Sequence, residues 1–440
     1  MNSNSEDNDL NARLCALELI SAIIDKRTTI DHAFDQSVSF SSLPQRDRNF
    51  TKMVVTTTIR RLGQIDDLIN FTLDHPDKIK IKTLRHILRL GVTQIFFMEV
   101  PDHAAVDTSV RLAEHHNFSR QKGFINAVLR RLIREGKERL DKQDTSRLNT
   151  PEWLLKHWVE DYGLIEAAKI AQANMIEPAL DITVKNPEER AYWGNTLQAS
   201  ELSTGTLRRI QGGNIRDLEG FNDGKWWVQD AAAAIPALLF GEDLTGKHII
   251  DLCAAPGGKT LQLVAKGATV TAIDRSAKRL KRLDENLKRM QLQDRVKTET
   301  ADASVWKPTE PAQHILLDAP CSATGTLRRH PDTAYIKSEQ DITRLMQIQE
   351  KILNHAATIL DIGGTLIYCT CSLQKAEGEH QIETFLGIHS NFERIPIEPH
   401  EIGKYNELIN EQGDLRILPY HLSEQGGIDG FFISRLKRNS

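Results

Sequence analysis

The sequence predicts a multidomain protein: an all-α N-terminal domain, a small α+β middle module and a C-terminal α/β domain with a doubly wound parallel sheet. Helical spacing of apolar residues fills the first part of the chain, and the middle part mixes helical and strand-like segments. From His248 onward, short apolar strands alternate with amphipathic helices. At 440 residues the chain exceeds one ordinary domain. We place the domains at residues 1–140, 141–240 and 241–440.

The composition is typical of a soluble, folded protein. Hydrophobic residues make up 40% and charged residues 26% of the chain, and no apolar run approaches the roughly 20 residues of a membrane span. The N-terminus is polar and acidic, which predicts no secretory signal. Five cysteines are an odd and sparse set that favours a reducing compartment. We therefore expect a cytoplasmic protein with no membrane partner.

The formal net charge is −4, so the chain is not basic as a whole. Basic clusters nevertheless occur at residues 59–63, 128–134, 206–210, 278–282 and 327–331. A solvated helix face explains any one of them. Their recurrence in every part of the chain permits a polyanionic partner without specifying it.

Residues 8–140 predict several short helices, with Pro44, Pro76 and Pro101 at breaks between them. Residues 137–151 are polar and end in proline, which predicts a linker. In the middle module, two helical segments, WLLKHWVEDYG and IEAAKIAQAN, precede the strand-like LDITVKN and two stretches of short strands or loops, TLRRIQGGNIRDL and KWWVQD.

The C-terminal domain predicts six strands. Five apolar segments alternate with helices, and GIDGFFISRL predicts a last strand after a turn. The five are HIIDLCA, ATVTAID, VKTETAD, HILLDAPC and GTLIYCT. The helices between them are GGKTLQLVAKG, RSAKRLKRLDENLKRMQ and SEQDITRLMQIQEKILNHAATI.

The segment from Asp251 to Thr260, DLCAAPGGKT, forms the turn after the first of these strands, where doubly wound folds bind nucleotide-like ligands. A phosphate-binding loop requires glycine where Cys253 stands, and the segment is one glycine short of the dinucleotide pattern. These departures disfavour phosphate binding. Taken alone, the turn is equally explained by a tight connection that needs small residues.

Acidic residues end the next three strands. Asp274 follows Gly257 by 17 residues, about where a carboxylate meets ribose hydroxyls in such folds. Asp302 and Asp318 end the third and fourth strands, and three such carboxylates at one sheet edge are not explained by core packing. A nucleoside ligand such as S-adenosylmethionine fits this edge better than a dinucleotide.

Two cysteines follow neighbouring strands, in Asp318-Ala-Pro-Cys321-Ser and Tyr368-Cys-Thr-Cys371-Ser. Adjacent strands lie about 4.8 Å apart, so both thiols should face one crevice beside Asp318. The C-x-C spacing is wrong for zinc, with His380 the nearest downstream imidazole, and a redox pair would need C-x-x-C. We therefore expect no metal.

A nucleophilic role remains. Cys371 precedes the helical stretch KAEGEHQIETFL, and a helix N-terminus lowers the pKa of a thiol. Packing explains Cys369, Cys253 and Cys15 better. A thiolate beside a methyl donor suits cytosine, because addition at C6 makes C5 nucleophilic. In that reaction Asp318, when protonated, would contact cytosine N3, and Cys321 would assist release.

At this point three blocks, DLCAAPGGKT, LLDAPCSATGTLRRHPD and YCTCS, resemble the NOL1/NOP/Sun family of RNA 5-methylcytosine methyltransferases. The segments RDRNFTKMVVTTTIRR, LRLGVTQIFFMEVPDHAAVDTSV and GFINAVLRRL resemble the NusB-like helical RNA-binding domain that precedes the catalytic domain in bacterial members acting on small-subunit ribosomal RNA. The resemblance implies a Rossmann-like methyltransferase domain, with a cytosine of 16S rRNA as substrate and S-adenosylmethionine as methyl donor. We expect a monomer.

Site residues also follow from the resemblance. Cys371 falls at the nucleophile, Cys321 at the cysteine linked to product release, and Asp318 at the acid beside the cytosine. The acids for ribose and adenine fall on Asp274 and Asp302. The remaining cofactor-binding positions are Cys253, Ala254, Ala255, Pro256, Gly257, Gly258 and Lys259. Cys369 departs from the family, which is expected to have a small residue there.

Three alternatives to this function were considered. The same chemistry on transfer RNA remains open, whereas Asp318, Cys321 and Cys371 argue against a non-catalytic RNA-binding or antitermination factor, and Cys253 disfavours a glycine-loop NTPase. Two local assignments are also open. Arg328 and Arg329 lie near the crevice and are explained equally by phosphate contact and by a surface ion pair. Trp226 and Trp227 could stack on a base, although core packing is the favoured interpretation.

Overall fold

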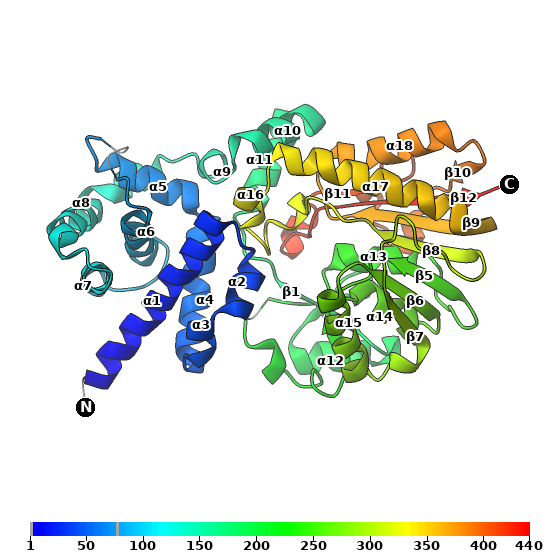
Figure 1. Cartoon of the computed structure of the whole chain (residues 1–440), viewed down its shortest axis with the longest axis horizontal. Helices are drawn as coiled ribbons and strands as arrows, with labels where there is room; N and C mark the ends of the chain where they lie inside the picture. Colours follow the sequence, from blue (N-terminus) through cyan, green and yellow to red (C-terminus); the bar gives the residue numbers. More distant parts are fainter. Residues whose placement is uncertain (1–2, 76–78, 211) are drawn as a thin grey trace. The chain divides into compact units, whose positions relative to one another are not determined.

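The computed structural model describes residues 3–75, 79–210 and 212–440 (Figure 1). Contacts divide the chain into two compact units. The helical unit comprises Met1–Met175 and His330–Ser338, and the α/β unit comprises Ile176–Arg329 and Glu339–Ser440. The predicted all-α and α/β regions are therefore present in the predicted order.

The helical unit is built of helices alone in its described part, as predicted. Pro44 and Pro101 directly precede two of its helices, α4 and α7, whereas the break at Pro76 lies outside the described residues. The helices are α1 Ser3–Lys26, α2 Ile30–Gln36, α3 Val38–Ser42, α4 Gln45–Arg60, α5 Leu62–Phe71, α6 Lys82–Phe96, α7 Asp102–His115, α8 Lys122–Asp141, α9 Thr145–Leu148, α10 Glu152–Tyr162, α11 Leu164–Ala173 and α16 Thr333–Ile336. Apolar faces of helices from α1 to α8 meet in one core that includes Ile20, Ile59, Ile87 and Leu129.

The structure divides the predicted middle module differently from the sequence. Residues 141–175 group with the helical unit, and only the rest of that segment joins the α/β unit. A physical cause is visible at α9, where Gln64 N–H donates to Asn149 Oδ1 at 3.1 Å and Asn149 Nδ2 donates to Gln64 Oε1 at 3.0 Å. Residues 330–338 join the same unit, since Ile30 N–H donates to Asp332 Oδ2 at 3.0 Å.

The middle module forms a four-stranded sheet in the order β2-β3-β1-β4. Both neighbours of β1 pair with it antiparallel. Trp226 and Trp227 are 0% and 3% exposed, so the core-packing interpretation is confirmed and base stacking is excluded. The elements are β1 Leu180–Val184, α12 Arg190–Leu197, β2 Ser200–Glu201, β3 Leu207–Arg209 and β4 Trp226–Val228.

The C-terminal part forms an eight-stranded sheet in the order β10-β12-β9-β8-β5-β6-β7, with β11 paired to β12. The predicted parallel sheet is confirmed for the five strands from β9 to β7. β12, by contrast, pairs antiparallel with β9, β10 and β11, so the sheet is mixed. The strands are β5 His248–Leu252, β6 Thr269–Asp274, β7 Val296–Thr300, β8 Ala312–Asp318, β9 Leu360–Thr370, β10 Phe392–Arg394, β11 Leu415–Ile417 and β12 Phe431–Arg438.

Helices cover both faces of this sheet (Figure 1). Alternate strand residues point to opposite faces, and Ile249 accordingly lies in one apolar cluster and Ile250 in the other. The helices on the first face are α13 Ala231–Leu238, α14 Gly258–Ala265 and α15 Ala277–Met290, and on the second face α17 Glu339–Ile359 and α18 Glu379–Ile388. Because β5, β6, β7, β8 and β9 are parallel, their carboxyl ends meet at one edge.

No helix in the described part of the chain is long and apolar enough to cross a membrane.

Candidate active site

The glycine-containing turn joins β5 to α14, as predicted. Cys253 has a φ of 65° and Gly257 a φ of 106°, both in the left-handed region. A Cβ atom on Gly257 would lie 2.1 Å from Cδ1 of Leu283 on α15. Glycine is therefore required at 257 by the backbone conformation and by the closeness of α15.

Asp274 lies at the end of β6, where it contacts this turn. Its Oδ2 accepts a hydrogen bond from Ala255 N–H at 3.3 Å, and its Oδ1 accepts one from Ser276 N–H at 2.9 Å. Arg279 Nη1 lies 3.0 Å from Oδ2, and the Arg279 side chain is half exposed. The predicted ribose-binding acid is thus held by the turn and covered by one solvent-accessible guanidinium.

Asp302 lies two residues beyond β7 and is exposed. Its Oδ1 accepts hydrogen bonds from Ser304 N–H at 2.9 Å and Ser304 Oγ at 2.7 Å. These two bonds lower the pKa of Asp302 more than its partial burial raises it. The predicted adenine-side acid is therefore a fixed and ionised carboxylate at the same edge of the sheet.

Lys259 and Asp318 form an ion pair, with Nζ 2.8 Å from Oδ2. The Lys259 side chain is 10% exposed, and its Nζ lies 5.0 Å from the centre of the Phe431 ring. Burial alone would lower the pKa of Lys259, but the charge of Asp318 and the neighbouring thiols of Cys369 and Cys371 raise it. Lys259, predicted only as part of the cofactor turn, is an ammonium group beside the catalytic candidates.

Cys321 and Cys371 face one another, with 3.5 Å between their sulfur atoms. Neighbouring strands bring them together, because β8 pairs with β9 and Asp318 lies opposite Cys369. The predicted juxtaposition is confirmed. A hydrogen bond to Cys371, followed by burial and the negative charges of Cys371 and Glu377, raises the pKa of Cys321 well above its usual value. Cys321 therefore keeps its proton at neutral pH.

The predicted helical stretch after Cys371 is present, but its α-helix does not begin beside the thiol. The segment after Cys371 forms a short 3-10 turn at Lys375–Glu377, and α18 begins only at Glu379. The residues between the thiol and Lys375 therefore separate Cys371 from the first helical turn. A cation nevertheless lies near the thiol, since Cys371 contributes to the raised pKa of Lys259.

Of the other cysteines, Cys15 and Cys369 are buried, as predicted, whereas Cys253 is partly exposed. Cys369 is 0% exposed, and burial together with the charge of Asp318, whose Oδ1 lies 3.7 Å from the sulfur, raises its pKa well above the usual value. Burial also raises the pKa of Cys253, and it raises that of Cys15 to about 11. None of these three thiols is prepared to act as a thiolate.

Arg328 and Arg329 both have partners within the protein. Arg328 is 2% exposed, and its Nη2 donates to the carbonyl oxygen of Gly426. Arg329 lies 2.7 Å from Asp230 Oδ2 and 3.0 Å from Asp429 Oδ2. The ion-pair interpretation is confirmed for Arg329, but its partners are buried carboxylates rather than surface groups.

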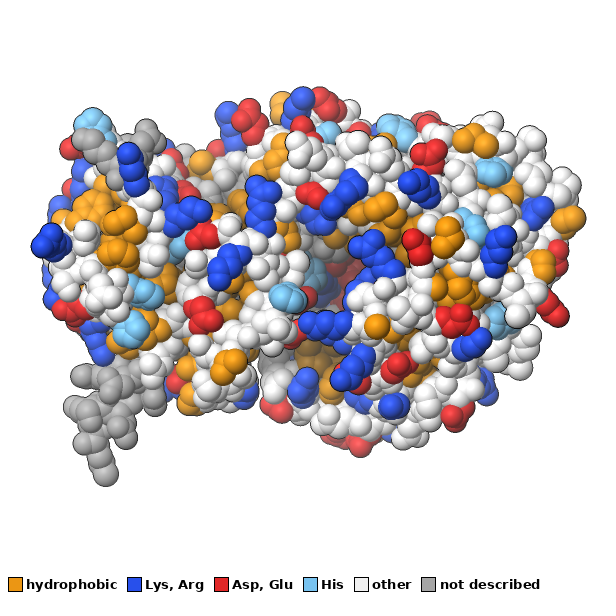
Figure 2. All heavy atoms as spheres, in the orientation of Figure 1, with side chains coloured by type: hydrophobic (Ala, Val, Ile, Leu, Met, Phe, Trp, Pro, Cys, Tyr) orange, Lys and Arg blue, Asp and Glu red, His pale blue; other side chains and the backbone are white. Residues whose placement is uncertain are grey.

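The five basic clusters separate into internal and exposed groups. In the cluster at 206–210, Arg208 is buried against Asp181, with 2.7 Å between Nη2 and Oδ2. The clusters on α8 and α15 keep exposed cations, among them Arg134 and Lys281. Figure 2 shows Lys and Arg side chains spread over the visible face among acidic ones. Among these clusters, the exposed cations of α8 and α15 are accessible to a polyanion such as RNA.

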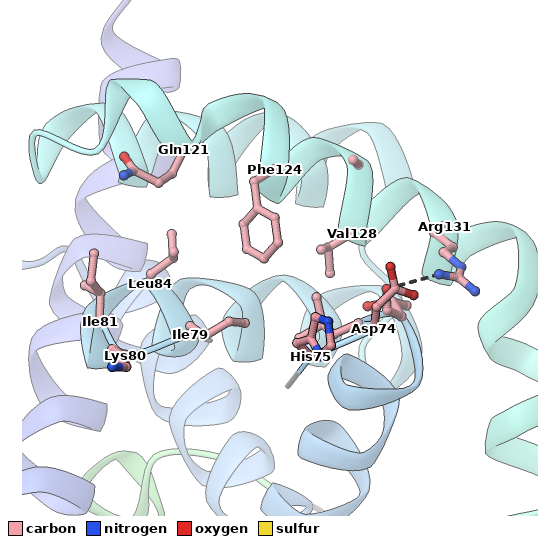
Figure 3. Close-up of a pocket in the computed structure, with 13 residues that line it drawn as sticks. Asp74, His75, Ile79, Lys80, Ile81, Leu84, Gln121, Phe124, Val128 and Arg131 are labelled. Atoms are coloured by element: carbon pink, nitrogen blue, oxygen red, sulfur yellow. Dashed lines mark hydrogen bonds between the residues drawn. The ribbon is translucent and has the colours of Figure 1, made fainter. Parts of the chain in front are cut away.

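The helical unit contains a pocket of about 640 Å³ (Figure 3). Apolar side chains from two segments line it, including Ile79, Leu84, Phe124 and Val128. At one end Arg131 Nη1 donates to the carbonyl oxygen of Thr72 at 3.1 Å. The predicted site residues all lie in the α/β unit, so this pocket is a separate feature.

Asp251, at the start of the glycine-containing turn, is fully buried. Its Oδ2 accepts a hydrogen bond from Thr260 Oγ1 at 2.5 Å, while Oδ1 has no partner. Burial raises the pKa of Asp251 to about 7 despite that hydrogen bond, whereas an unfolded aspartate has a pKa of about 3.9. Between these values the folded state binds a proton that the unfolded state lacks, so this group costs stability as pH rises from about 4 to about 7.

The unsubstituted protein should lose unfolding free energy between pH 5 and pH 8 as Asp251 ionises. We predict that this loss is smaller by a few kcal/mol in Asp251→Asn, which has no proton to lose. Urea unfolding of both proteins at the two pH values measures this difference. The exposed Asp223 provides the control, since Asp223→Asn should leave the pH dependence unchanged. Equal pH dependence in Asp251→Asn and the unsubstituted protein would contradict the prediction.

Comparison with known proteins identifies both parts of the chain. The family described as 16S rRNA methyltransferase RsmB/F matches residues 241–437. The NusB family matches residues 10–134. The matched ranges correspond to the C-terminal and N-terminal domains that the sequence predicted.

Full-length relatives agree with these matches. The chain is 33% identical over 444 residues to ribosomal RNA small subunit methyltransferase B of Pseudomonas putida, covering 97% of this chain and 98% of the relative. It is 32% identical over 421 residues to the protein of that name from Shigella flexneri, covering 92% and 96%.

Two solved structures share the fold. The crystal structure of PH0851 has a TM-score of 0.75 at 24% identity and covers 98% of each chain. NSun6 from Pyrococcus horikoshii, solved with SFG, has a TM-score of 0.56 at 20% identity and covers 66% of this chain and 98% of its own.

Proposed function

Because this chain belongs to the family of 16S rRNA methyltransferases RsmB/F, with a NusB-type domain ahead of the methyltransferase domain, we propose that it methylates C5 of a cytosine in 16S rRNA. S-adenosylmethionine is the proposed methyl donor. One observation carries the cytosine chemistry: the sulfur atoms of Cys321 and Cys371 lie 3.5 Å apart beside the Lys259–Asp318 ion pair.

The residues at the sheet edge fit this donor. Residues 253–258 form a turn of small side chains, and Asp274, Asp302 and Asp318 surround its edge with carboxylates, which suit a sulfonium cation and ribose hydroxyls. When bound, S-adenosylmethionine supplies an electrophilic methyl group. Asp274 is the proposed ribose contact and Asp302 the proposed adenine contact.

The reaction begins with addition of the Cys371 thiolate to cytosine C6. The new S–C6 bond places an electron pair on C5, which makes C5 nucleophilic, and negative charge develops toward N3. Asp318 supplies a proton to N3 and takes its replacement from the Lys259 ammonium group, which donates to Asp318 Oδ2, so the charge on the base is neutralised and Lys259 becomes neutral. Lys259 also stabilises the thiolate before attack, because its ammonium group interacts with Cys371.

Release reverses the addition. After C5 is methylated, water takes the C5 proton, the C6–S bond breaks and its electron pair returns to the Cys371 sulfur. N3 then returns its proton through Asp318 to Lys259, which restores the ion pair. Cys321 keeps its proton and lies 3.5 Å away, so its S–H donates a hydrogen bond to the departing thiolate. This is the proposed role of Cys321 in product release.

The target cytosine has to leave its stack, because C6 is not accessible to a thiolate within a helix. The helical unit is the proposed RNA-binding part. Exposed cations on α8, such as Arg130 and Arg134, suit contact with the phosphate backbone.

Methyl transfer to RNA tests the proposal. Purified protein is incubated with S-adenosylmethionine and either unmodified 16S rRNA or transfer RNA, and nucleosides are then separated by mass spectrometry. We expect one 5-methylcytosine per 16S rRNA and none in transfer RNA. Methylation of another atom, or of transfer RNA alone, would overturn the corresponding part of the proposal.

Replacing Cys321 should separate attack from release. We predict that Cys321→Ala forms the bond between Cys371 and C6 but releases RNA slowly, because the departing thiolate loses its hydrogen-bond donor. Denaturing gels with labelled RNA should show a covalent complex that the double variant Cys321→Ala/Cys371→Ala lacks. Absence of that complex in Cys321→Ala would show that Cys321 has no part in release.

A further inference from the structure

A buried carboxylate lies beneath both cysteine-bearing loops. Glu377 is 0% exposed and ends the short 3-10 turn that follows Cys371 in the chain. The sequence did not single it out, since a glutamate in a polar segment carries no signal of its own. A surface glutamate is hydrated by water, whereas the carboxylate of Glu377 accepts hydrogen bonds from protein groups.

Both oxygens of Glu377 are saturated by donors. Oε1 accepts from Ser322 N–H at 2.9 Å and from Gln349 Nε2 at 2.9 Å. Oε2 accepts from the Ser322 hydroxyl and, at 2.6 Å, from the Ser372 hydroxyl. An ionised carboxylate only accepts hydrogen bonds, so four donors match it completely.

The donors flank the two cysteines of the site. Ser322 directly follows Cys321, and Ser372 directly follows Cys371. Gln349 of α17 donates to Glu377 and also to the carbonyl oxygen of Pro320, the residue before Cys321, at 2.9 Å. One carboxylate thus connects both loops through the residues next to the two thiols.

We propose that Glu377 is a positioning residue that holds Ser322 and Ser372 and thereby keeps the two cysteine sulfurs in contact. This inference rests on the proposed function of Cys321 and Cys371. A single acceptor shared by both loops fixes their separation more strongly than bonds within either loop. A further link, Gly325 N–H to the Cys371 carbonyl oxygen at 2.9 Å, joins the same two loops.

The geometry has an electrostatic consequence. The negative charge of Glu377 disfavours a second thiolate at Cys321, and it contributes to the raised pKa of that thiol after the Cys371 hydrogen bond and burial. Glu377 therefore helps to keep Cys321 protonated.

Two readouts test the proposal in the full-length protein. The first readout is catalytic. In Glu377→Gln an NH₂ group replaces one carboxylate oxygen and cannot accept hydrogen bonds, so about half of the hydrogen bonds to this side chain are lost. We expect kcat to fall about 100-fold, as for a displaced nucleophile, with KM for RNA changed less than about threefold. The second is independent of catalysis: oxidation of Cys321 and Cys371 to a disulfide by diamide, measured by peptide mass spectrometry, should slow at least about fivefold.

Single-donor variants keep the test valid if Glu377→Gln fails to fold. Ser322→Ala should accumulate the covalent RNA complex, because it loosens the loop that carries Cys321. Ser372→Ala should form less of that complex, because it loosens the loop that carries Cys371. If Glu377 had a merely structural role, Ser322→Ala and Ser372→Ala should slow formation and release of the covalent complex to the same extent. Glu401→Gln is the control, since Glu401 pairs with Arg435 and contacts neither loop.

Unchanged kcat and an unchanged diamide rate in Glu377→Gln would overturn the positioning role. Another combination of results would contradict the proposed methylation but leave the positioning role of Glu377 intact. If the unsubstituted protein forms the disulfide quickly and Glu377→Gln slowly, while neither methylates RNA, the positioning of the thiols stands and the assigned reaction does not.

Discussion

Cys371→Ala should abolish methylation of 16S rRNA, with a loss of at least about 10⁴-fold in kcat. No other described thiol can substitute for it, because Cys321 keeps its proton and Cys369 is fully buried. Removal of a covalent nucleophile commonly costs several orders of magnitude, since the step that it performs has no equivalent in its absence. Single-turnover transfer of a labelled methyl group to 16S rRNA measures the loss.

The neighbouring thiol provides a matched control. Cys369→Ala removes an identical side chain two residues away on β9 but leaves the pair of Cys321 and Cys371 in place. We expect its rate to stay within about threefold of the unsubstituted protein, with a stability loss typical of a small buried side chain. If Cys369→Ala loses activity and Cys371→Ala keeps it, the assignment of the nucleophile is wrong.

Arg329→Met should destabilise the α/β unit by about 3–5 kcal/mol, because it removes the cation that pairs with the buried carboxylates of Asp230 and Asp429. Arg329 Nη2 lies 2.7 Å from Asp230 and 3.8 Å from Asp181, and its Nε lies 3.0 Å from Asp429. The side chains of the three acids are at most 6% exposed. Thermal unfolding should show a fall in Tm on the order of 10 °C.

Two further variants separate charge from geometry. Arg329→Lys keeps the positive charge but not the planar fork, so we expect an intermediate loss. Arg344→Met makes the matched change at a side chain that is 68% exposed, and its effect should stay within about 0.5 kcal/mol. Equal Tm values for Arg329→Met and Arg344→Met would show that Arg329 does not stabilise the carboxylates.

Much of the molecule was predictable from local patterns. Apolar periodicity of 3.6 residues located the helical unit, and the alternation of strands and helices located the parallel part of the large sheet. The acids that follow β6, β7 and β8 were found because the carboxyl ends of parallel strands share one edge. The contact of Cys321 with Cys371, fifty residues apart in the chain, followed from the same rule.

Features that depend on several distant segments were missed. The last strand, β12, was predicted, but its antiparallel direction and the short strands β10 and β11 were not, because a short apolar run does not reveal its direction. Residues 330–338 join the helical unit through contacts such as that of Ile30 with Asp332, which no local pattern encodes. The start of the helix after Cys371 was also mispredicted. Its apolar pattern was visible in the sequence, but that pattern did not show that α18 begins only at Glu379.

The sequence by itself determined the kinds of domain, their order and the thiols and acids at one sheet edge, because these depend on periodicity and on strand ends. Only the tertiary structure decided which charges face one another. Arg329 and Lys259 are both cations next to candidate site residues in the chain, yet one neutralises a buried acid cluster and the other pairs with Asp318. Burial makes such pairing necessary, and the partner is chosen by packing between segments far apart in the chain.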